Sequence, residues 1–70
     1  MTYYEIETAR GTLEHNDYAI EYKTDSLQDM LDYVHRLQRV HDETKDDLAL
    51  VRVYKYRNGK GSIVINNVIF

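Results

Sequence analysis

The chain has 70 residues, no cysteine, no proline and a formal net charge of −3. A chain of this length forms one domain with a small core, which is marginally stable unless a staple or self-association supports it. The lack of cysteine excludes disulfides and thiolate metal sites. No signal peptide is visible, and no apolar stretch approaches the roughly 20 residues that span a membrane. We therefore expect one cytoplasmic domain, residues 1–70, without membrane contact.

The net charge hides an uneven distribution along the chain. Residues 1–32 carry eight acidic and two basic residues, a net charge of −6, whereas residues 33–70 carry four acidic and seven basic residues, a net charge of +3. Opposite charges in the two halves either attract each other within one fold or guide the pairing of two copies or of a partner. The sequence leaves both interpretations open.

Two segments in the first third have the alternating pattern of β-strands. In residues 2–8, Tyr4 and Ile6 share one face and polar residues dominate the other. In residues 17–23, Tyr18, Ile20 and Tyr22 share the face that we expect to point to the core. The two segments are predicted to form a hairpin with a long or irregular connection.

A helix is predicted to begin after Ser26. The hydroxyl of this serine can cap a backbone N–H in the first turn, and nearby acidic residues suit the positive end of the helix dipole. Apolar residues then recur with 3.6-residue spacing and form one stripe, which consists of Leu27, Met30, Leu31, Val34, Leu37 and His41. We expect the helix to end near His41 and a polar loop to follow.

The dipeptide Asn58-Gly59 lies between two apolar runs and is the strongest local signal in the chain. A type I′ turn needs a positive φ at both central residues, which Asn and Gly tolerate best. A hairpin with this two-residue loop pairs Val53 with Val64. The same register pairs Arg57 with Lys60 and Ala49 with Val68.

This register divides residues 48–70 into two faces that are both apolar. One face carries Ala49, Val51, Val53, Lys55, Val64, Asn66, Val68 and Phe70. The other carries Leu48, Leu50, Arg52, Tyr54, Tyr56, Ile63, Ile65, Asn67 and Ile69. We expect the helix to cover the second face, which has the bulkier aliphatic side chains. A β-bulge would swap part of this assignment, and reversed faces would expose Arg52, Tyr54 and Tyr56 instead.

The predicted fold is α+β, a ββαββ two-layer domain with a four-stranded, mainly antiparallel sheet and one helix on one face. One helix covers only one face, so an apolar patch stays exposed unless the N-terminal hairpin or the loop of residues 9–16 folds over that patch. Large exposed apolar patches mark interaction sites. The predicted interface with a second copy or an unidentified protein consists of Val51, Val53, Val64, Val68 and Phe70.

The function expected from this patch is that of a small non-enzymatic protein-binding module that forms a homodimer. Small size, high charge and many tyrosines are typical of phage and mobile-element proteins that regulate or inhibit a larger protein. The alternative is a nucleic-acid-binding accessory protein, because basic residues and tyrosines interleave along the second hairpin. Such residues neutralise phosphates and stack on unpaired bases. That surface would consist of Arg52, Tyr54, Lys55, Tyr56, Arg57 and Lys60.

No pattern in the sequence predicts catalysis, a cofactor or a metal site. There is no cysteine nucleophile, and no Ser or Thr has an adjacent base in a known catalytic arrangement. His35 and His41 are six residues apart on the predicted helix, so their side chains point in different directions. One helix on a small sheet does not easily enclose a cleft that excludes water. We therefore expect no enzymatic activity.

Overall fold

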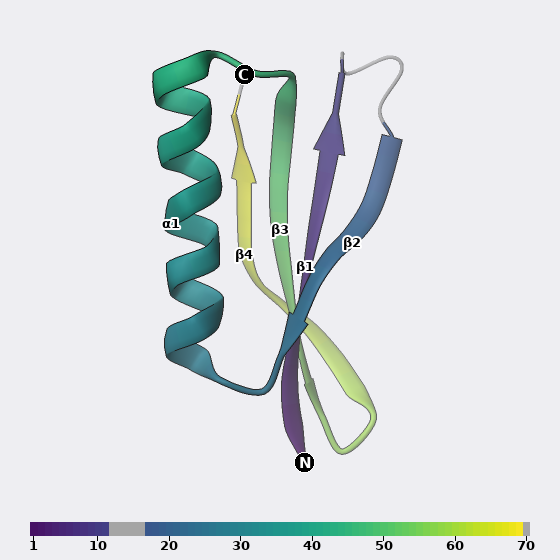
Figure 1. Cartoon of the computed structure of the whole chain (residues 1–70). Coiled ribbons are helices and arrows are strands. Elements are labelled where there is room, and N and C mark those ends of the chain that lie inside the picture. Colours follow the sequence, from purple (N-terminus) through teal and green to yellow (C-terminus); the bar gives the residue numbers. More distant parts are fainter. Residues whose placement is uncertain (12–16, 70) are drawn as a thin grey trace.

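The computed structural model describes residues 1–11 and 17–69. Its elements are β1 (Thr2–Arg10), β2 (Asp17–Thr24), α1 (Leu27–Thr44), β3 (Leu48–Arg57) and β4 (Lys60–Val68). The strands form one antiparallel sheet in the order β2-β1-β3-β4, with α1 packed on one face (Figure 1). The predicted ββαββ two-layer fold is confirmed.

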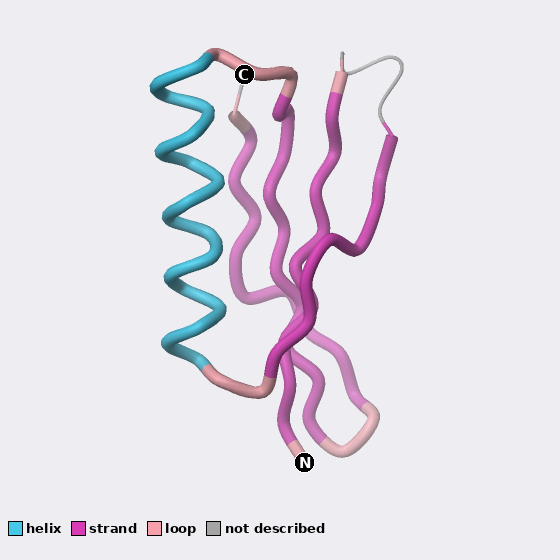
Figure 2. Tube along the Cα trace, in the orientation of Figure 1, coloured by secondary structure: helices cyan, strands magenta, loops and turns pink. Residues whose placement is uncertain are grey.

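The helix joins two strands that are not neighbours in the sheet. β2 and β3 run in the same direction on either side of β1, so the chain crosses over β1 as α1 before it enters β3 (Figure 2). The backbone of α1 lies closest to β1 and β2. The edge strand β4 contributes only partly buried side chains, Ile65 and Ile69, to the helix-side core.

Both ends of α1 are set by local chemistry. The Asp29 amide donates a hydrogen bond to the Ser26 side chain at 3.1 Å, which confirms the predicted N-cap. The helix continues past His41, where we predicted its end, because no glycine or proline interrupts the polar residues that follow. It ends at Thr44, and the C-cap residue Lys45 adopts the left-handed conformation with φ 52° and ψ 47°. This conformation is typical of a helix C-terminus.

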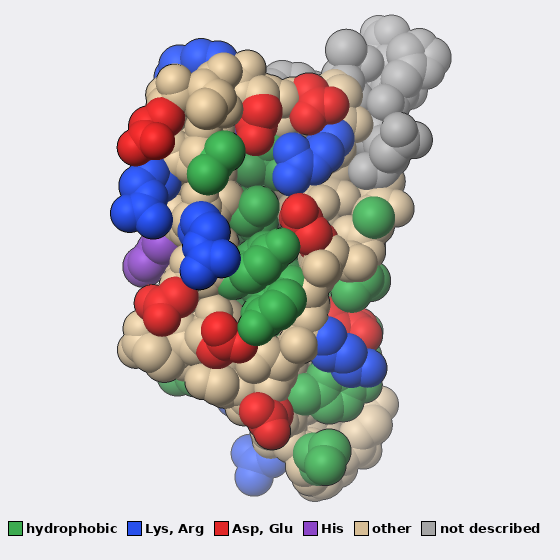
Figure 3. Space-filling model, in the orientation of Figure 1, with side chains coloured by type: hydrophobic (Ala, Val, Ile, Leu, Met, Phe, Trp, Pro, Cys, Tyr) green, Lys and Arg blue, Asp and Glu red, His purple; other side chains and the backbone are tan. Residues whose placement is uncertain are grey.

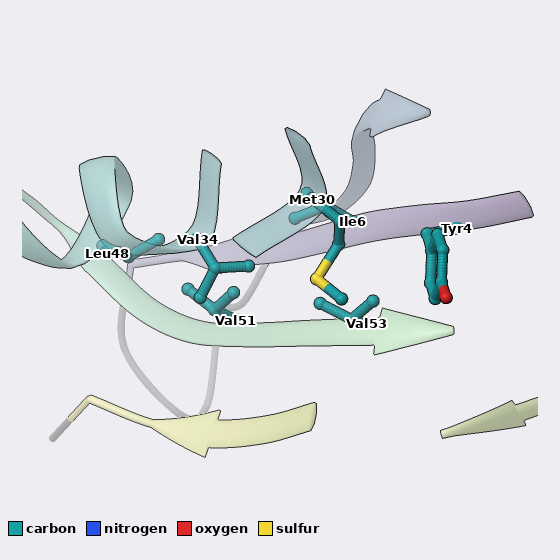
Figure 4. Packing of buried hydrophobic residues seen from close by; sticks show 7 residues of the cluster. All are labelled: Tyr4, Ile6, Met30, Val34, Leu48, Val51 and Val53. Carbon is teal, nitrogen blue, oxygen red and sulfur yellow. The ribbon is translucent and has the colours of Figure 1, made fainter. Parts of the chain in front are cut away.

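The core lies between α1 and the two central strands. Met30 and Val34 point from the helix toward β1 and β3 (Figure 4). The cluster consists of Tyr4, Ile6, Met30, Val34, Leu48, Val51 and Val53. Each buried aliphatic side chain of this size stabilises the fold by about 1.5–3 kcal/mol, so these few contacts fix the position of the helix.

The predicted orientation of the β3–β4 hairpin is wrong. The helix covers the face that carries Val51 and Val53, which are 1% and 0% exposed, and leaves the face with Arg52, Tyr54 and Tyr56 uncovered. A guanidinium or phenol group that is buried without partners loses its hydration, whereas a valine loses nothing polar. The free-energy cost of desolvating these polar groups outweighs the gain from burying the larger aliphatic side chains of that face, on which the prediction rested.

The hairpin turn is confirmed, but the register beyond it differs from the prediction. Asn58 and Gly59 have φ values of 53° and 82°, as a type I′ turn requires. Further along, Val53 pairs with Ile65 instead of Val64, because Val64 is the extra residue of a β-bulge in β4. The bulge shifts the pairing by one residue and changes which β4 side chains share a face with β3.

A second bulge, in β2, changes which of its side chains reach the helix. The register skips Glu21. Tyr22 therefore faces α1 and stacks on Tyr33, with ring centroids 4.3 Å apart and planes 3° from parallel. Tyr18 and Ile20 are 55% and 49% exposed, so the expectation that both face the core is wrong.

A polar cluster ties the C-terminal end of α1 to the sheet. His41 Nδ1 lies 2.9 Å from Asp46 Oδ1, which also accepts a hydrogen bond from the Leu48 amide at 3.2 Å. Arg10 Nη1 lies 3.6 Å from the other oxygen of Asp46. The hydrogen bond with His41 does most to lower the pKa of Asp46, and the Leu48 amide and the Arg10 charge add to this effect against desolvation.

The orientation of the hairpin can be tested by truncating one residue on each face. Val53→Ala removes buried methyl groups and leaves a cavity, so we expect the free energy of unfolding to fall by about 2–3 kcal/mol. Val68→Ala is the control, because Val68 is 63% exposed, and should change that free energy by about 0.5 kcal/mol or less. Urea denaturation measures both values, and a larger loss in Val68→Ala would contradict the observed orientation.

The Asp46 cluster predicts a loss of stability in acid. A carboxyl group whose pKa is lower in the folded state stabilises the fold fully above its unfolded pKa of 3.8. That contribution disappears as the pH falls through the folded-state pKa. Asp46→Asn should therefore flatten the decrease in melting temperature between about pH 5 and pH 2. The exposed Glu43 supplies the control, Glu43→Gln, and an equal slope in wild type and Asp46→Asn would refute the assignment.

Candidate protein-binding face

The sheet face opposite α1, here called the open face, is the candidate functional site. Its side chains alternate along each strand with those that point to the helix. They are Tyr3, Glu5, Glu7 and Ala9 of β1, Tyr18, Ile20 and Lys23 of β2, Leu50, Arg52, Tyr54 and Tyr56 of β3, and Ile63, Asn66 and Val68 of β4. Ala9 and Leu50 are buried although they lie on this face. The opposite, helix side of the molecule has acidic and basic side chains interspersed around a strip of hydrophobic ones beside α1 (Figure 3).

A hydrogen-bonded triad occupies the centre of the open face. Arg52 Nη1 donates to Glu7 Oε1 at 3.3 Å and to the Tyr54 hydroxyl oxygen at 3.2 Å. The Tyr54 hydroxyl in turn donates to Glu7 Oε1 at 3.2 Å. The hydrogen bond with Tyr54 does most to raise the pKa of Arg52. The triad neutralises its own charges and fixes the orientation of all three side chains.

A stacked pair of tyrosines continues this layer toward the hairpin turn. The rings of Tyr3 and Tyr56 have centroids 5.0 Å apart and planes 14° from parallel. Lys23 Nζ lies 4.6 Å from the centre of the Tyr3 ring and 3.7 Å from a carboxylate oxygen of Glu5. Both charges of this ion pair therefore lie beside the stack and cancel each other.

Gly61 leaves the space that the Tyr56 ring needs in order to stack on Tyr3. It pairs with Tyr56 across the β3–β4 ladder. A Cβ atom added to Gly61 would lie 2.7 Å from Tyr56 Cε1, closer than side chains tolerate. The absence of a side chain at this position lets the Tyr56 ring lie across β4 and stack on Tyr3.

The margins of the open face are apolar. Tyr18 and Ile20 on one edge strand are 55% and 49% exposed, and Ile63 and Val68 on the other are 53% and 63% exposed. The open face therefore combines an ordered polar and aromatic centre with two exposed apolar borders.

The residues predicted for the dimer interface do not form one surface. Val51 and Val53 belong to the core, so neither is accessible to a second copy. Val64 lines a hollow on the helix side, whereas Val68 lies on the open face. Phe70 lies outside the described residues. The bulge at Val64 and the reversed hairpin together account for this separation.

The residues predicted for nucleic-acid contact are also divided. Arg52, Tyr54 and Tyr56 lie on the open face, Lys55 lines the hollow on the helix side, and Arg57 and Lys60 are exposed beside the turn. On the open face, Glu5 and Glu7 lie beside these tyrosines. The six residues thus do not form one basic surface.

Sequence reasoning missed the contribution of Glu7 to the Arg52 triad. Glu7 and Arg52 are 45 positions apart in sequence and become neighbours only through the β1–β3 pairing. The alternation of Arg52, Tyr54 and Tyr56 with the two valines of β3 could have indicated the polar face. Neither β2 nor β4 contains a signal that predicts its bulge.

Within residues 1–11 and 17–69, no three histidine or carboxylate side chains come together where they could hold a metal ion. In the same part of the chain, no helix is long and apolar enough to cross a membrane. No protein-family model, curated protein or solved structure matches this chain.

The contact between the Tyr56 ring and Gly61 can be tested by adding one methyl group at position 61. Gly61→Ala should displace the ring and weaken the Tyr3–Tyr56 stack, which we expect to move the ring proton resonances of both tyrosines in NMR spectra. The neighbouring Ser62 is exposed, so Ser62→Ala should leave these resonances in place. Unchanged ring resonances in Gly61→Ala would show that Gly61 does not position Tyr56.

Proposed function

We propose that this protein is a non-enzymatic protein-binding module whose open face docks onto a folded partner protein. The observation that carries the proposal is the ordered Tyr–Arg–Glu centre bordered by exposed apolar side chains. Interfaces are enriched in tyrosine and arginine, and their strongest contacts cluster near the centre of the contact area. Regulation or inhibition of a larger protein fits a domain of this size.

The preorganised centre of the open face supports binding to a protein. Arg52 and Tyr54 are held by hydrogen bonds to Glu7, and Tyr56 is held by its stack on Tyr3. A side chain that is already ordered loses less conformational entropy on binding. The centre therefore presents rigid aromatic area with hydroxyl groups that can hydrogen bond across an interface.

The charge of the open face favours a protein over a nucleic acid. Glu5 and Glu7 balance Lys23 and Arg52, and each acid lies close to a base. Affinity for a phosphate backbone comes from unbalanced positive charge. The partner surface that matches this face has little net charge, apolar groups for the two borders and hydrogen-bonding groups for the centre.

A matched pair of variants tests this proposal. Tyr56→Ala removes an aromatic ring from the open face, and Arg39→Ala removes an exposed side chain from α1. Proteins that the immobilised wild type captures from a lysate are compared with those captured by each variant. The retained partner is then purified, and its affinity for each variant is measured by calorimetry.

We expect Tyr56→Ala to weaken binding of the purified partner by about tenfold or more, because central aromatic residues carry much of the binding energy. Arg39→Ala should bind as the wild type does. Equal affinities of wild type and Tyr56→Ala would refute the open face as the interface. Retention of nucleic acid alone, lost as salt is raised, would favour the nucleic-acid alternative.

A further inference from the structure

The outer edge of β4 lacks most of the features that prevent a sheet edge from pairing. Native edge strands are blunted by charged residues, proline, bulges or a covering element. From Gly61 to Val68 the strand contains neither a charged residue nor proline. The opposite edge strand, β2, carries Glu21 and Lys23 within its length. Only the bulge at Val64 interrupts the edge of β4.

The backbone groups of β4 that point outward can be identified from its ladder with β3. The Ile69 amide donates a hydrogen bond to the Ala49 carbonyl at 2.9 Å. Hydrogen-bonded and non-hydrogen-bonded pairs alternate along an antiparallel ladder, so Asn67 also bonds to β3. Asn66 and Val68 therefore direct their N–H and C=O groups away from the sheet.

The helix leaves this edge open. Ile65 and Ile69 of β4 pack against the core beneath α1 and are only partly buried, and Val64 and Val68 are 46% and 63% exposed. Beside Val64, on the helix side, lies a hollow of about 290 Å³ that Leu27 and Leu31 also line. Leu27 is itself 54% exposed. Apolar surface on both sides of the strand thus adjoins its unpaired backbone groups.

We propose that β4 pairs antiparallel with β4 of a second copy and joins two sheets into one. A two-fold axis perpendicular to the sheet keeps both helices on the same face. With the axis at Asn67, the outward groups of Asn66 bond to those of Val68 of the second copy, and Ile65 lies opposite Ile69. All these residues follow the bulge, so the bulge does not interrupt the new ladder.

We infer that a second copy of this chain pairs with the β4 edge, because residues 65–69 can pair with themselves without electrostatic repulsion. Antiparallel self-pairing of residues 65–69 opposes no like charges, since none of them is charged. The pairing places the two open faces side by side, and it uses backbone groups that the open-face partner of the proposed function does not need. The new ladder is short, so we expect a dimer that dissociates on dilution.

Light scattering on a sizing column tests this pairing over a dilution series from about 1 µM to about 1 mM. Asn67 is exposed and would face Asn67 of the second copy, so Asn67→Lys and Asn67→Glu each place like charges opposite each other. We expect the wild type to shift to dimer as its concentration rises. Each single variant should stay monomeric, and an equimolar mixture of the two should form the dimer.

A second pair of variants tests the backbone groups. Asn66→Pro removes an outward N–H and spares every backbone hydrogen bond between β4 and β3, so it should give a folded monomer. It also removes the hydrogen bond from Arg52 Nε to Asn66 Oδ1 at 3.5 Å, which the control variant lacks as well. Asn66→Ala keeps that N–H and should dimerise as the wild type does. A wild type that is monomeric at all concentrations would overturn the proposal, as would a dimer that persists in Asn67→Lys. A dimer lost only in Tyr56→Ala would assign self-association to the open face instead.

Discussion

The packing of one helix against two central strands determines the rest of this structure. Met30 and Val34 pack over Ile6, Val51 and Val53, and this contact is the core. Residues 1–11 and 17–69 contain a single helix, so the helix covers one sheet face and leaves most of the other exposed. The open face and the β4 edge follow from this constraint.

Bulges determine which side chains the uncovered surfaces present. The extra residue in β2 turns Tyr22 toward the helix and leaves Tyr18 and Ile20 on the open face. The extra residue in β4 places Ile63 and Asn66 on the same face although they are three positions apart. Bulges increase the local twist of a strand. The apolar borders of the open face therefore depend on irregular pairing in the edge strands.

The parts of this fold that sequence could predict are those set by local chemistry. Ser26 marks the helix start through its own hydroxyl, and Asn58-Gly59 specifies its turn through backbone preference. The prediction of the face that α1 covers was wrong because it compared only the size of the aliphatic side chains on the two hairpin faces. It left out the free-energy cost of burying Arg52 beside two tyrosines. That cost depends on Glu7, which pairing of distant strands brings to Arg52. The bulges depend on tertiary packing, so sequence patterns do not reveal them.

The surfaces that the helix leaves uncovered are those that we expect to associate. Residue-resolved amide hydrogen exchange of β4, measured by NMR at low and high protein concentration, tests this expectation most directly. The Asn67 amide should be protected at both concentrations, because it bonds to β3. The amides of Asn66 and Val68 should exchange fast at low concentration and slowly at high concentration. Fast exchange of Asn66 and Val68 at both concentrations would contradict the account.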